Sequence, residues 1–549
     1  MLRHACLMLI ALTHVPLAAH PPEPQVGQFV ASGTVFDPIV RQMLRNNYDV
    51  WLARADTGEV DVLLTPSQLQ QLQAQGLDLK VNARLSWDAR MQASAAPGQT
   101  NGIANYPCYR TVEETLQRLD ELALAHPNLV SVSTVGDSYL RSVGTGGYPI
   151  KAIRIENKAV PGAKAPMMLI GAIHAREYTT AETVLRFAEY LLAGYRTNAD
   201  ITWMLDHSSI LLIPQANPDG RKRAETGISQ RRNLRPLTCA VTPANSGVDL
   251  NRNSSFYWGV QGGSSVNGCD DTFRGTAAGS EPEVQAIESV ITSFFADQRG
   301  PGVVDAAPID ATGLFISLHS YSKLVLFPWG AVSNAAPNKA GLETLGRKFG
   351  HFTRYKVCQP PSCLYAASGT TDDKAYGEAG VAAFTFELGT SFFEACPSYE
   401  QNVWPIMREA LSYGLKAARR PYQEPSGPET VQLRATRLEN TITIRGFADD
   451  TRSFSNGVGN EAIQNIVGAE YFVEQPPQSG APAIAMQSAD GSFDASRESL
   501  YSRFTRADAA SVTRIFVRAR DSTGQFGVPT AVWVVEQPAD LVFFDGLED

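Results

Sequence analysis

The sequence predicts a central α/β domain whose sheet is covered by helices on both faces, with a small α+β unit before it and a β-sandwich after it. Between residues 104 and 424, short apolar runs typical of buried strands alternate with segments of helical period. Beyond this region, segments alternate polar and apolar residues between Gly, Asp, Ser and Asn turns, as half-buried strands do. A chain of 549 residues is also too long for a single core.

Composition and charge narrow the classes of partner. The chain has 44% apolar and 19% charged residues, which is typical of a globular protein. Its net charge of −9 argues against nucleic acid or an anionic membrane as the main partner. No apolar run approaches the roughly 18 residues of a transmembrane helix. We therefore expect neither a nucleic-acid partner nor a transmembrane segment.

Residues 1–19 are typical of a secretory signal peptide, which predicts a secreted or periplasmic protein. Arg3 provides the positive start, an apolar stretch follows, and Leu17-Ala18-Ala19 forms a small-residue cleavage site. A buried N-terminal helix is the alternative, but the PPEP run that follows suits a cleaved signal better. Six cysteines would remain, and an even number in an exported chain suggests disulfides. A cysteine-ligated zinc is the rival interpretation, but the sequence has no CxxC pair.

Residues 20–102 are expected to form the α+β unit and a linker. The segment YDVWLARADTGEVDVLLT predicts two strands around a Thr-Gly turn. In TPSQLQQLQAQGLDL a helix follows, with Thr65 as N-cap, Gln68 at the capping-box position and Gly76 at the end. The small, polar stretch MQASAAPGQTNGIAN has the composition of a linker and of a protease-sensitive site.

The α/β domain is expected at 103–424 and the β-sandwich at 425–537. In the first, helices are expected in TVEETLQRLDELALAHP and TAETVLRFAEYLLAGY, and strands in PIKAIRI, APMMLIGA, SSILLIPQ, TGLFISLH and VAAFTFEL. The linker RRPYQEPSGPET leads to strands in TITIRGFA, AEYFVEQ, VTRIFVRARD and TAVWVVEQ. The acidic tail 538–549 has no assignment.

Three residues at predicted strand ends are candidate metal ligands. His174 and Glu177 follow an apolar strand in GAIHAREYTT, and His319 ends another in LFISLHSYSKLVLFPWG. Sites in open α/β sheets gather beyond the carboxyl ends of strands, and a catalytic zinc usually has three protein ligands and one open position. Taken separately, His174 and Glu177 could belong to a surface loop, and His319 could be a histidine of the core. Together they predict a metal centre.

Other polar residues could complete a catalytic site. Glu387 lies inside the apolar strand VAAFTFELG, where a carboxylate needs a partner. It is either half of a structural salt bridge or a general base that accepts a proton from a metal-activated water. In SGVDLNRNSSFYWGVQGGSS, Asn251 and Arg252 can both donate to a carboxylate. Asp249 could hold a ligating imidazole by its second N–H.

Taken in order, these segments resemble the zinc carboxypeptidases related to pancreatic carboxypeptidases A and B, especially their secreted bacterial members. The resemblance spans roughly residues 104–420 and includes HARE, QRRN, DLNRN, ISLHSYSKLVLFPWG, YAASGTTDDKAYGEAG and FTFELG. It implies the family's mixed eight-stranded sheet flanked by helices and one zinc ion. It also implies hydrolysis of the C-terminal bond of peptides or proteins that have a free terminal carboxylate.

The same resemblance implies a role for each site residue. Zinc would be held by His174, Glu177 and His319, with Asp249 orienting the first histidine. Glu387 would be the catalytic base, and Arg231 would stabilise the oxyanion. Asn251, Arg252 and Tyr365 would bind the terminal carboxylate of the substrate. Arg176 would contact its penultimate part, and Tyr321 would also bind the substrate. Asp372 would lie at the base of the pocket for the terminal side chain.

Asp372 favours substrates that end in Lys or Arg. B-type enzymes of the family carry an aspartate at this position, whereas A-type enzymes have an apolar pocket base. Two departures leave a mixed specificity open. Lys374 stands where the family usually has tryptophan and could pair with Asp372, and Gly330 stands where B-type enzymes often carry serine.

The resemblance extends more loosely to residues 20–85, which match the family's propeptides in position and pattern. Such a segment usually covers the active-site cleft until it is cleaved, so we expect the protein to be made as a precursor. We also expect it to be a monomer. Among the cysteines, Cys239 and Cys269 bracket DLNRN much as a family disulfide does, and Cys358 is close enough to Cys363 to bridge a tight loop. This leaves Cys108 with Cys396.

Two alternative functions are weighed against the same residues. A catalytically dead relative that serves as a binding protein would lack a ligand or the base, and all are present. A zinc hydrolase for murein peptides or acylated amino acids would alter the carboxylate clamp, and Asn251, Arg252 and Tyr365 are in place.

Overall fold

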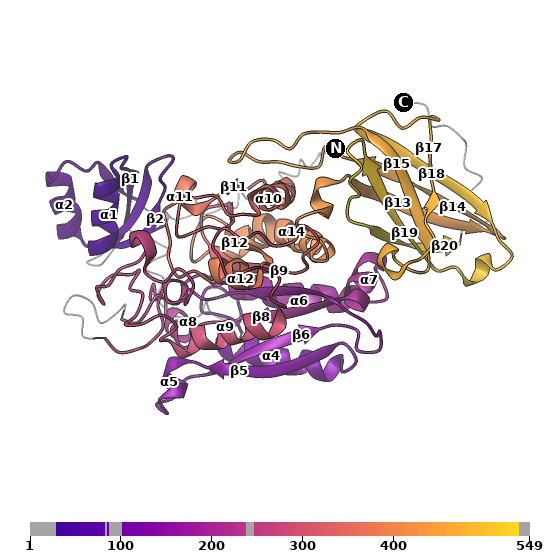
Figure 1. Cartoon of the computed structure of the whole chain (residues 1–549). Coiled ribbons are helices and arrows are strands. Elements are labelled where there is room, and N and C mark those ends of the chain that lie inside the picture. Colours follow the sequence, from indigo (N-terminus) through magenta and orange to yellow (C-terminus); the bar gives the residue numbers. More distant parts are fainter. Residues whose placement is uncertain (1–28, 83–84, 87–100, 238–245, 537–549) are drawn as a thin grey trace, which may run out of the picture.

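The computed structural model describes residues 29–82, 85–86, 101–237 and 246–536, which form three parts (Figure 1). The N-terminal unit and a C-terminal β domain lie at opposite ends of a central α/β domain. The predicted signal peptide, most of the predicted linker, Cys239 and the tail 538–549 lie outside the described residues. Within the described residues, none of the helices combines the length and apolar character needed to cross a membrane.

The N-terminal unit is a four-stranded antiparallel sheet with two helices. In chain order its elements are β1 (Phe29–Thr34), α1 (Pro38–Asn47), β2 (Asp49–Ala53), β3 (Glu59–Leu64), α2 (Pro66–Ala74) and β4 (Leu79–Val81). The strand order is β2-β3-β1-β4. Helix α2 begins with the expected capping box: the Gln68 amide donates to Thr65 Oγ1, and the Thr65 amide donates to Gln68 Oε1.

The central sheet is mixed and has eight strands in the order β11-β10-β12-β9-β7-β8-β6-β5, which confirms the predicted fold class. The four inner strands β12, β9, β7 and β8 are mutually parallel. Five strands match the predicted apolar runs: β6 (Pro149–Ile155), β7 (Ala165–Ile170), β8 (Ser208–Ile213), β9 (Leu314–Ser320) and β12 (Ala382–Leu388). The sequence did not indicate β5 (Val130–Asp137), β10 (Leu324–Leu326) or β11 (Lys356–Cys358).

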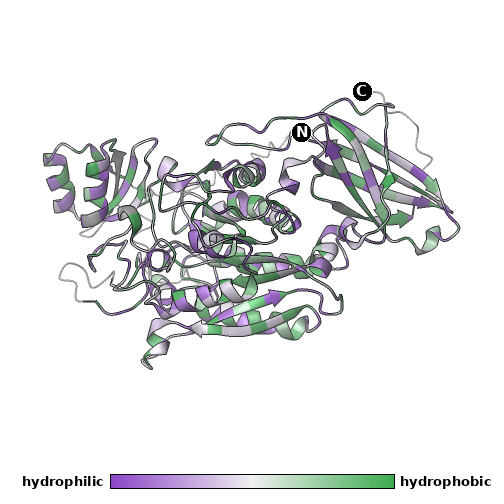
Figure 2. Ribbon diagram, viewed as in Figure 1, coloured by the Kyte–Doolittle hydropathy of each residue, from purple (hydrophilic) through white to green (hydrophobic). Residues whose placement is uncertain are grey.

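Helices cover both faces of this sheet. On one face, α6 (Tyr178–Gly194) contacts α14 (Trp404–Ala417), which contacts α10 (Lys339–Thr353). On the other, α9 (Pro282–Phe294) contacts α12 (Thr371–Ala379). The remaining helices of this domain are α4 (Val112–Ala125), α5 (Tyr139–Ser142), α7 (Ala199–His207), α8 (Pro218–Ala224), α11 (Pro360–Cys363) and α13 (Cys396–Ser398). The strands between these layers are strongly hydrophobic (Figure 2).

The C-terminal domain consists of eight strands in the order β16-β15-β19-β20-β13-β14-β18-β17, and β14 and β18 fold over to contact β15. Its elements are β13 (Glu429–Leu438), β14 (Thr441–Asp449), β15 (Ile466–Val473), β16 (Ile484–Ala485), β17 (Gln487–Ser488), β18 (Arg497–Thr505), β19 (Arg514–Asp521) and β20 (Thr530–Glu536). The domain docks on α7, where Trp203 packs against Phe516 with ring centroids 6.1 Å apart. The Ala531 amide also donates to Asp200 at 2.6 Å.

Candidate metal centre

The topology of the sheet brings the three candidate ligands together. Strands β7 and β9 are adjacent and parallel, so their carboxyl ends lie at the same edge. His174 and Glu177 lie in the turn between β7 and α6, and His319 is the penultimate residue of β9. All three are at most 3% exposed, so their polar atoms depend on one another and on the surrounding protein.

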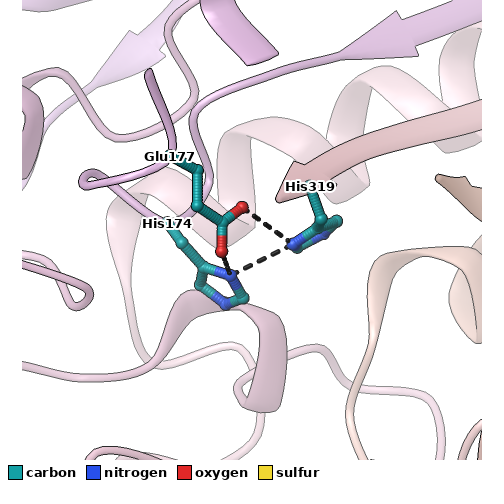
Figure 3. Close-up of side chains that lie close together, drawn as sticks. All are labelled: His174, Glu177 and His319. Atoms are coloured by element: carbon teal, nitrogen blue, oxygen red, sulfur yellow. Dashed lines mark hydrogen bonds and ion pairs between the residues drawn. The ribbon is translucent and has the colours of Figure 1, made fainter. Parts of the chain in front are cut away.

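The ligand atoms converge on one point (Figure 3). His174 Nδ1 lies 2.8 Å from Glu177 Oε1 and 3.0 Å from His319 Nδ1, and His319 Nδ1 lies 3.3 Å from Glu177 Oε2. Two imidazole nitrogens and one carboxylate are a donor set that catalytic zinc uses. Among the described residues, this is the one group of three His, Cys, Asp or Glu side chains arranged to hold a metal ion.

Outer contacts orient both imidazoles. His174 Nε2 lies 3.1 Å from Asp249 Oδ1, and His319 Nε2 lies 3.0 Å from Ser317 Oγ. With the Nε2 proton donated outward, each ring directs its Nδ1 lone pair toward the common point, as metal-binding histidines do. The side chains therefore fit a zinc ion. Ser317 was not foreseen, because a serine within a strand carries no distinguishing pattern.

Glu387 faces the same point from the next strand. Strands β12 and β9 are parallel, and their register places Glu387 opposite His319. Phe384 and Phe386 pack on Phe349 of α10, so the alternation of the strand directs Glu387 to the other face. Burial raises the pKa of Glu387 well above its ordinary value and the nearby charge of Glu177 adds to the effect, whereas the positive charge of a zinc ion held by the ligands would oppose it and favour the ionised base.

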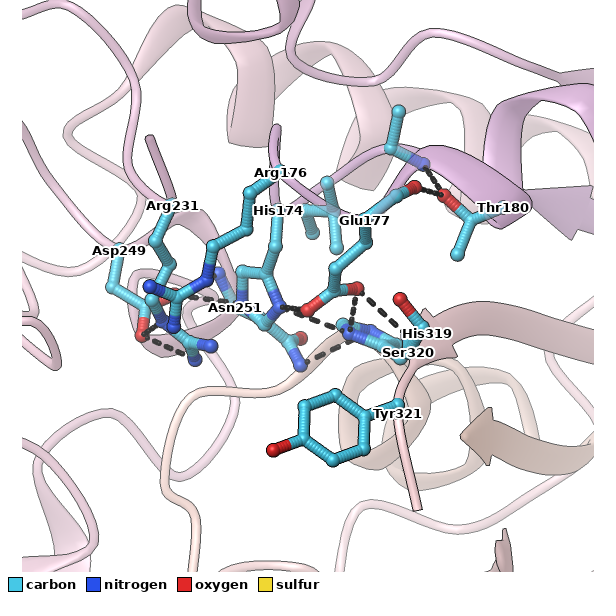
Figure 4. A network of polar contacts seen from close by, with 12 residues as sticks. His174, Arg176, Glu177, Thr180, Arg231, Asp249, Asn251, His319, Ser320 and Tyr321 are labelled. Carbon is cyan, nitrogen blue, oxygen red and sulfur yellow. Dashed lines mark hydrogen bonds and ion pairs between the residues drawn. The ribbon is translucent and has the colours of Figure 1, made fainter. Parts of the chain in front are cut away.

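Asp249 joins His174 to Arg231 (Figure 4). One of its oxygens contacts His174, while the other accepts from Arg231 Nε at 3.0 Å and from Nη2 at 2.9 Å. Burial alone would raise the pKa of Asp249, but the charges of Arg231 and Arg252 more than offset it, so the pKa lies well below its ordinary value. The carboxylate is therefore ionised at neutral pH.

The three predicted clamp residues line one cavity with the metal ligands, Arg231 and Glu387. The Thr371 amide donates to Asn251 Oδ1 at 3.1 Å, which fixes the amide of Asn251. Arg252 donates to the Asn251 carbonyl at 2.7 Å, and its guanidinium lies 5.8 Å from the centroid of the Tyr365 ring. The side chains thus present several donors to one space.

Asp372 and Gly330 also line this cavity, whereas Lys374 does not. Lys374 donates to Ser255 at 2.7 Å and forms ion pairs with Glu288 and Glu378. In the described part of the chain, no basic side chain lies within ion-pair distance of Asp372. The adjacent Asp373, which the sequence did not single out, accepts from the amides of Gly330 and Ala331 at 2.8 and 3.0 Å.

The N-terminal unit occupies the mouth of the cleft. Trp51 and Leu52 of β2 line the cavity that holds the metal ligands. Arg176 donates to Asp49 at 2.8 Å, and the Tyr321 hydroxyl donates to Asp61 at 2.6 Å. The two predicted substrate-binding side chains are thus engaged by this unit. Asp61 was detectable in principle, since it interrupts the apolar strand EVDVLL.

Two disulfides lie in the described residues. Cys108 is joined to Cys396 and Cys358 to Cys363, with Cα atoms 5.6 and 6.3 Å apart. These are the two expected pairs that fall within the described residues. The expected Cys239–Cys269 pair involves Cys239, which lies outside them.

Comparison with known families and curated proteins gives a consistent result. The family model described as zinc carboxypeptidase matches residues 115–408. Carboxypeptidase A1 of Rattus norvegicus is 32% identical over 306 residues, which cover 54% of this chain and 67% of the relative. Carboxypeptidase A2 of the same organism is 30% identical over 384 residues, which cover 67% of this chain and 85% of the relative. Carboxypeptidase B of Astacus astacus is 31% identical over 292 residues, which cover 52% of this chain and 87% of the relative.

Solved structures share the fold. The carboxypeptidase A from Helicoverpa armigera superposes with a TM-score of 0.59 at 25% identity, and the match covers 72% of this chain and 98% of that one. Thrombin-activatable fibrinolysis inhibitor, at 22% identity, matches with a TM-score of 0.57 over 71% of this chain and 98% of that one.

Proposed function

Because this chain belongs to the zinc carboxypeptidase family, we propose that it removes C-terminal residues from peptides and proteins with a preference for Lys and Arg. The family and the ligand group together make it a zinc-dependent metallocarboxypeptidase. The preference is supported by one observation: Asp372 lines the cleft, and Lys374 is held elsewhere by Glu288 and Glu378.

His174, Glu177 and His319 would hold the zinc ion, which supplies a Lewis acid for the scissile carbonyl and lowers the pKa of water. Asn251, Arg252 and Tyr365 bind the free terminal carboxylate and so position the last peptide bond. Glu387 accepts a proton from the attacking water and delivers it to the leaving amine. Arg231 donates to the oxygen that becomes negative in the transition state.

The pocket electrostatics support the side-chain preference. Asp372 is only 2% exposed, so its charge is weakly screened. A terminal Lys or Arg would neutralise it, whereas a terminal Phe would bury it without a partner at a cost of about 1–3 kcal/mol. A difference of this size corresponds to roughly 5- to 150-fold in specificity.

Hydrolysis of a matched series of blocked dipeptides tests the proposal. The series ends in Lys, Arg, Phe, Leu or Glu, with a C-terminal amide as the control that lacks the carboxylate. We expect kcat/KM to be highest for Arg and Lys, and activity to disappear with a chelator. Asp372→Asn should lower kcat/KM for basic substrates about tenfold or more while sparing Phe and Leu. An equal loss for all substrates would make Asp372 structural and remove the basis for the preference.

We further propose that the chain is made as an inactive precursor whose N-terminal unit blocks the cleft. The support is that Trp51 and Leu52 line the catalytic cavity, and that Asp49 engages Arg176. Arg45 also lies over the Tyr365 ring, 5.0 Å from its centroid. Limited proteolysis within residues 87–100 should therefore raise activity strongly. Full activity in the uncut protein would refute this proposal.

We also propose that residues 1–19 direct export of the precursor and that the protein is a monomer. Sequencing of the N-terminus after expression in a secreting host should find it at residue 20. Light scattering of the purified protein should give the mass of one chain.

A further inference from the structure

The pocket for the terminal side chain takes its walls from two segments that are far apart in the chain. Asp372 lies in the first turn of α12, and Gly330 lies in the segment that follows β10. Both residues line the cavity of the metal centre. The distance between these two walls therefore depends on a contact that joins α12 to the segment after β10.

Asp373 makes this contact. It is fully buried, and one carboxyl oxygen accepts from the Gly330 N–H at 2.8 Å while the other accepts from the Ala331 N–H at 3.0 Å. Two acceptors on successive N–H groups fix both the position and the orientation of this peptide segment. The ring of Trp329 also packs on Tyr376 of α12, with ring centroids 4.9 Å apart. The segment is thus attached to α12 by a polar and an aromatic contact.

The same turn of α12 also holds the carboxylate clamp. The N–H and the hydroxyl of Thr371 donate to Asn251 Oδ1 at 3.1 and 3.4 Å. Three consecutive residues thus serve three parts of the site: Thr371 contacts the clamp, Asp372 lines the pocket, and Asp373 holds the second wall. The terminal carboxylate and the terminal side chain of a substrate branch from one carbon atom, so their two binding places must keep a fixed separation.

The wall at Gly330 leaves little spare width. A Cβ atom at this position would lie 3.3 Å from the Ala367 carbonyl oxygen and 3.5 Å from Thr370 Oγ1. The Gly330 carbonyl also accepts from the Ala367 N–H at 2.9 Å. Without the carboxylate of Asp373, two buried N–H groups would lose their acceptors, which is unfavourable. The segment would stay attached through the Ala367 hydrogen bond but would turn about it, which changes the width of the pocket.

The acceptor role holds in both protonation states of Asp373. Burial and the charge of Asp372 raise the pKa of Asp373 well above its ordinary value, and the two N–H groups oppose this shift. A carboxyl group keeps an accepting oxygen with or without its proton, whereas alanine has none. Substitution by alanine therefore removes the contact at any pH.

We propose that Asp373 is a positioning residue that holds the Gly330 wall at the distance from Asp372 that long terminal side chains require. The proposal rests on the carboxypeptidase activity proposed above. A terminal Arg or Phe fills the pocket and contacts both walls, whereas a terminal Ala ends at its Cβ atom. Asp373 should therefore affect the choice among terminal side chains and leave the chemistry at the metal centre unchanged.

Hydrolysis of blocked dipeptides that end in Arg, Phe or Ala tests the inference after cleavage within residues 87–100. In Asp373→Ala, we expect kcat/KM to fall about tenfold or more for Arg and Phe, mainly through a higher KM, and to change at most about twofold for Ala. Asp373→Asn keeps one accepting oxygen and should retain more of the selectivity. Glu378→Gln lies on the same helix but outside the cavity lining, and as the matched control it should change none of the three values.

Gly330→Ala provides a second test that keeps the buried carboxylate. The added methyl group would have only slightly tight contacts, so the variant should fold, and it should lower kcat/KM for Arg and Phe but not for Ala. An equal loss for all three substrates in Asp373→Ala would make that residue merely structural and overturn the inference. Unchanged selectivity in either alanine variant would also overturn it. If the cleaved parent protein hydrolyses none of the three substrates, the proposed function itself fails, and the inference falls with it.

Discussion

Asp249 connects the metal ligands to the rest of the site through one carboxylate. It contacts His174 Nε2 and accepts hydrogen bonds from Nε and Nη2 of Arg231. It also accepts a hydrogen bond from the backbone N–H of Asn251 at 3.0 Å. A single side chain therefore sets the position of a ligand, of the proposed oxyanion donor and of the clamp.

Asp249→Asn should lower zinc affinity about 10–100-fold, because the neutral amide is a weaker partner for the His174 N–H and cannot balance Arg231. Competition with a coloured chelator measures the affinity. Asp120→Asn, which removes an exposed partner of Lys151, is the matched control and should leave the affinity unchanged. Equal zinc affinity in the Asp249 variant and the parent would contradict the orienting role.

Glu387→Gln separates catalysis from metal binding. The glutamine keeps the shape of the side chain but cannot accept the proton, so kcat should fall about 10²–10⁴-fold. Zinc content, measured by elemental analysis, should stay at one ion per chain, because Glu387 is not among the converging ligands. A loss of thermal stability with unchanged kcat would make the role of Glu387 structural instead.

Residue types at strand ends could be foreseen, whereas contacts between distant parts could not. His174, Glu177 and His319 each follow an apolar run, and the parallel sheet brings such ends together. The engagement of Arg176 by Asp49 joins residues 127 positions apart and depends on how two separate units dock. The placement of Lys374 away from Asp372 likewise depends on Glu288 of α9. No local pattern carries that information.

At the scale of elements, strand β2 brings an acidic side chain against a buried cation. Arg176 lies 2.8 Å from Asp49 and 3.6 Å from Asp271 of the central domain. Burial would raise the pKa of Asp49, but Arg176 and hydrogen bonds hold it below its ordinary value. Burial raises the pKa of Asp271 well above its ordinary value, and the charge of Asp49 adds to this.

Docking of the N-terminal unit should therefore weaken as the pH rises. A raised pKa means that docked Asp271 retains its proton, and this contribution is lost when the pH rises through the raised value. The contribution of Asp49 is lost only at acidic pH, below the ordinary carboxyl range. After cleavage within 87–100, the unit should separate more readily in size-exclusion chromatography at alkaline pH.

Asp271→Asn provides the control for this pH dependence. The amide resembles the protonated carboxyl and does not titrate, so the variant should retain the N-terminal unit across the range. Retention that is independent of pH in the parent protein, or stronger at alkaline pH, would contradict the role assigned to Asp271.

Strands and helices with a clear hydrophobic pattern could be predicted from the sequence, whereas those with a weak pattern could not. The apolar strands β7, β9 and β12 lie in the interior of the sheet and read as nearly continuous hydrophobic runs. Strand β5 lies at an edge and is largely polar, while β10 and β11 have only three residues each. Strand β1, FVASGT, is built mostly of small residues, which seldom indicate a strand.

At the scale of the whole molecule, the Cys108–Cys396 disulfide joins the start of the central domain to a point near its end, 288 residues apart. Closing so long a loop reduces the entropy of the unfolded chain, which raises its free energy by roughly 6 kcal/mol in the chain-entropy description. The double variant Cys108→Ser/Cys396→Ser should therefore lose about 2–5 kcal/mol of unfolding free energy in denaturant titrations.

The second disulfide is the matched control, because Cys358 and Cys363 are only five residues apart. Its removal should cost clearly less, since a short loop restricts the unfolded chain less. Equal losses for the two double variants would show that loop length does not govern the stabilisation.

The long disulfide also turns the central domain into a covalent ring. The metal ligands, Glu387 and the carboxylate clamp all lie inside this ring, whereas residues 87–100 and the β domain lie outside it. A protease that cuts once between residues 108 and 396 leaves both pieces attached, so they migrate together in electrophoresis until a reductant is added. A cut in 87–100 has no such covalent tether, so the N-terminal unit migrates separately in denaturing electrophoresis even without a reductant. Electrophoresis with and without reductant thus distinguishes a cut that frees the cleft from one that damages the domain.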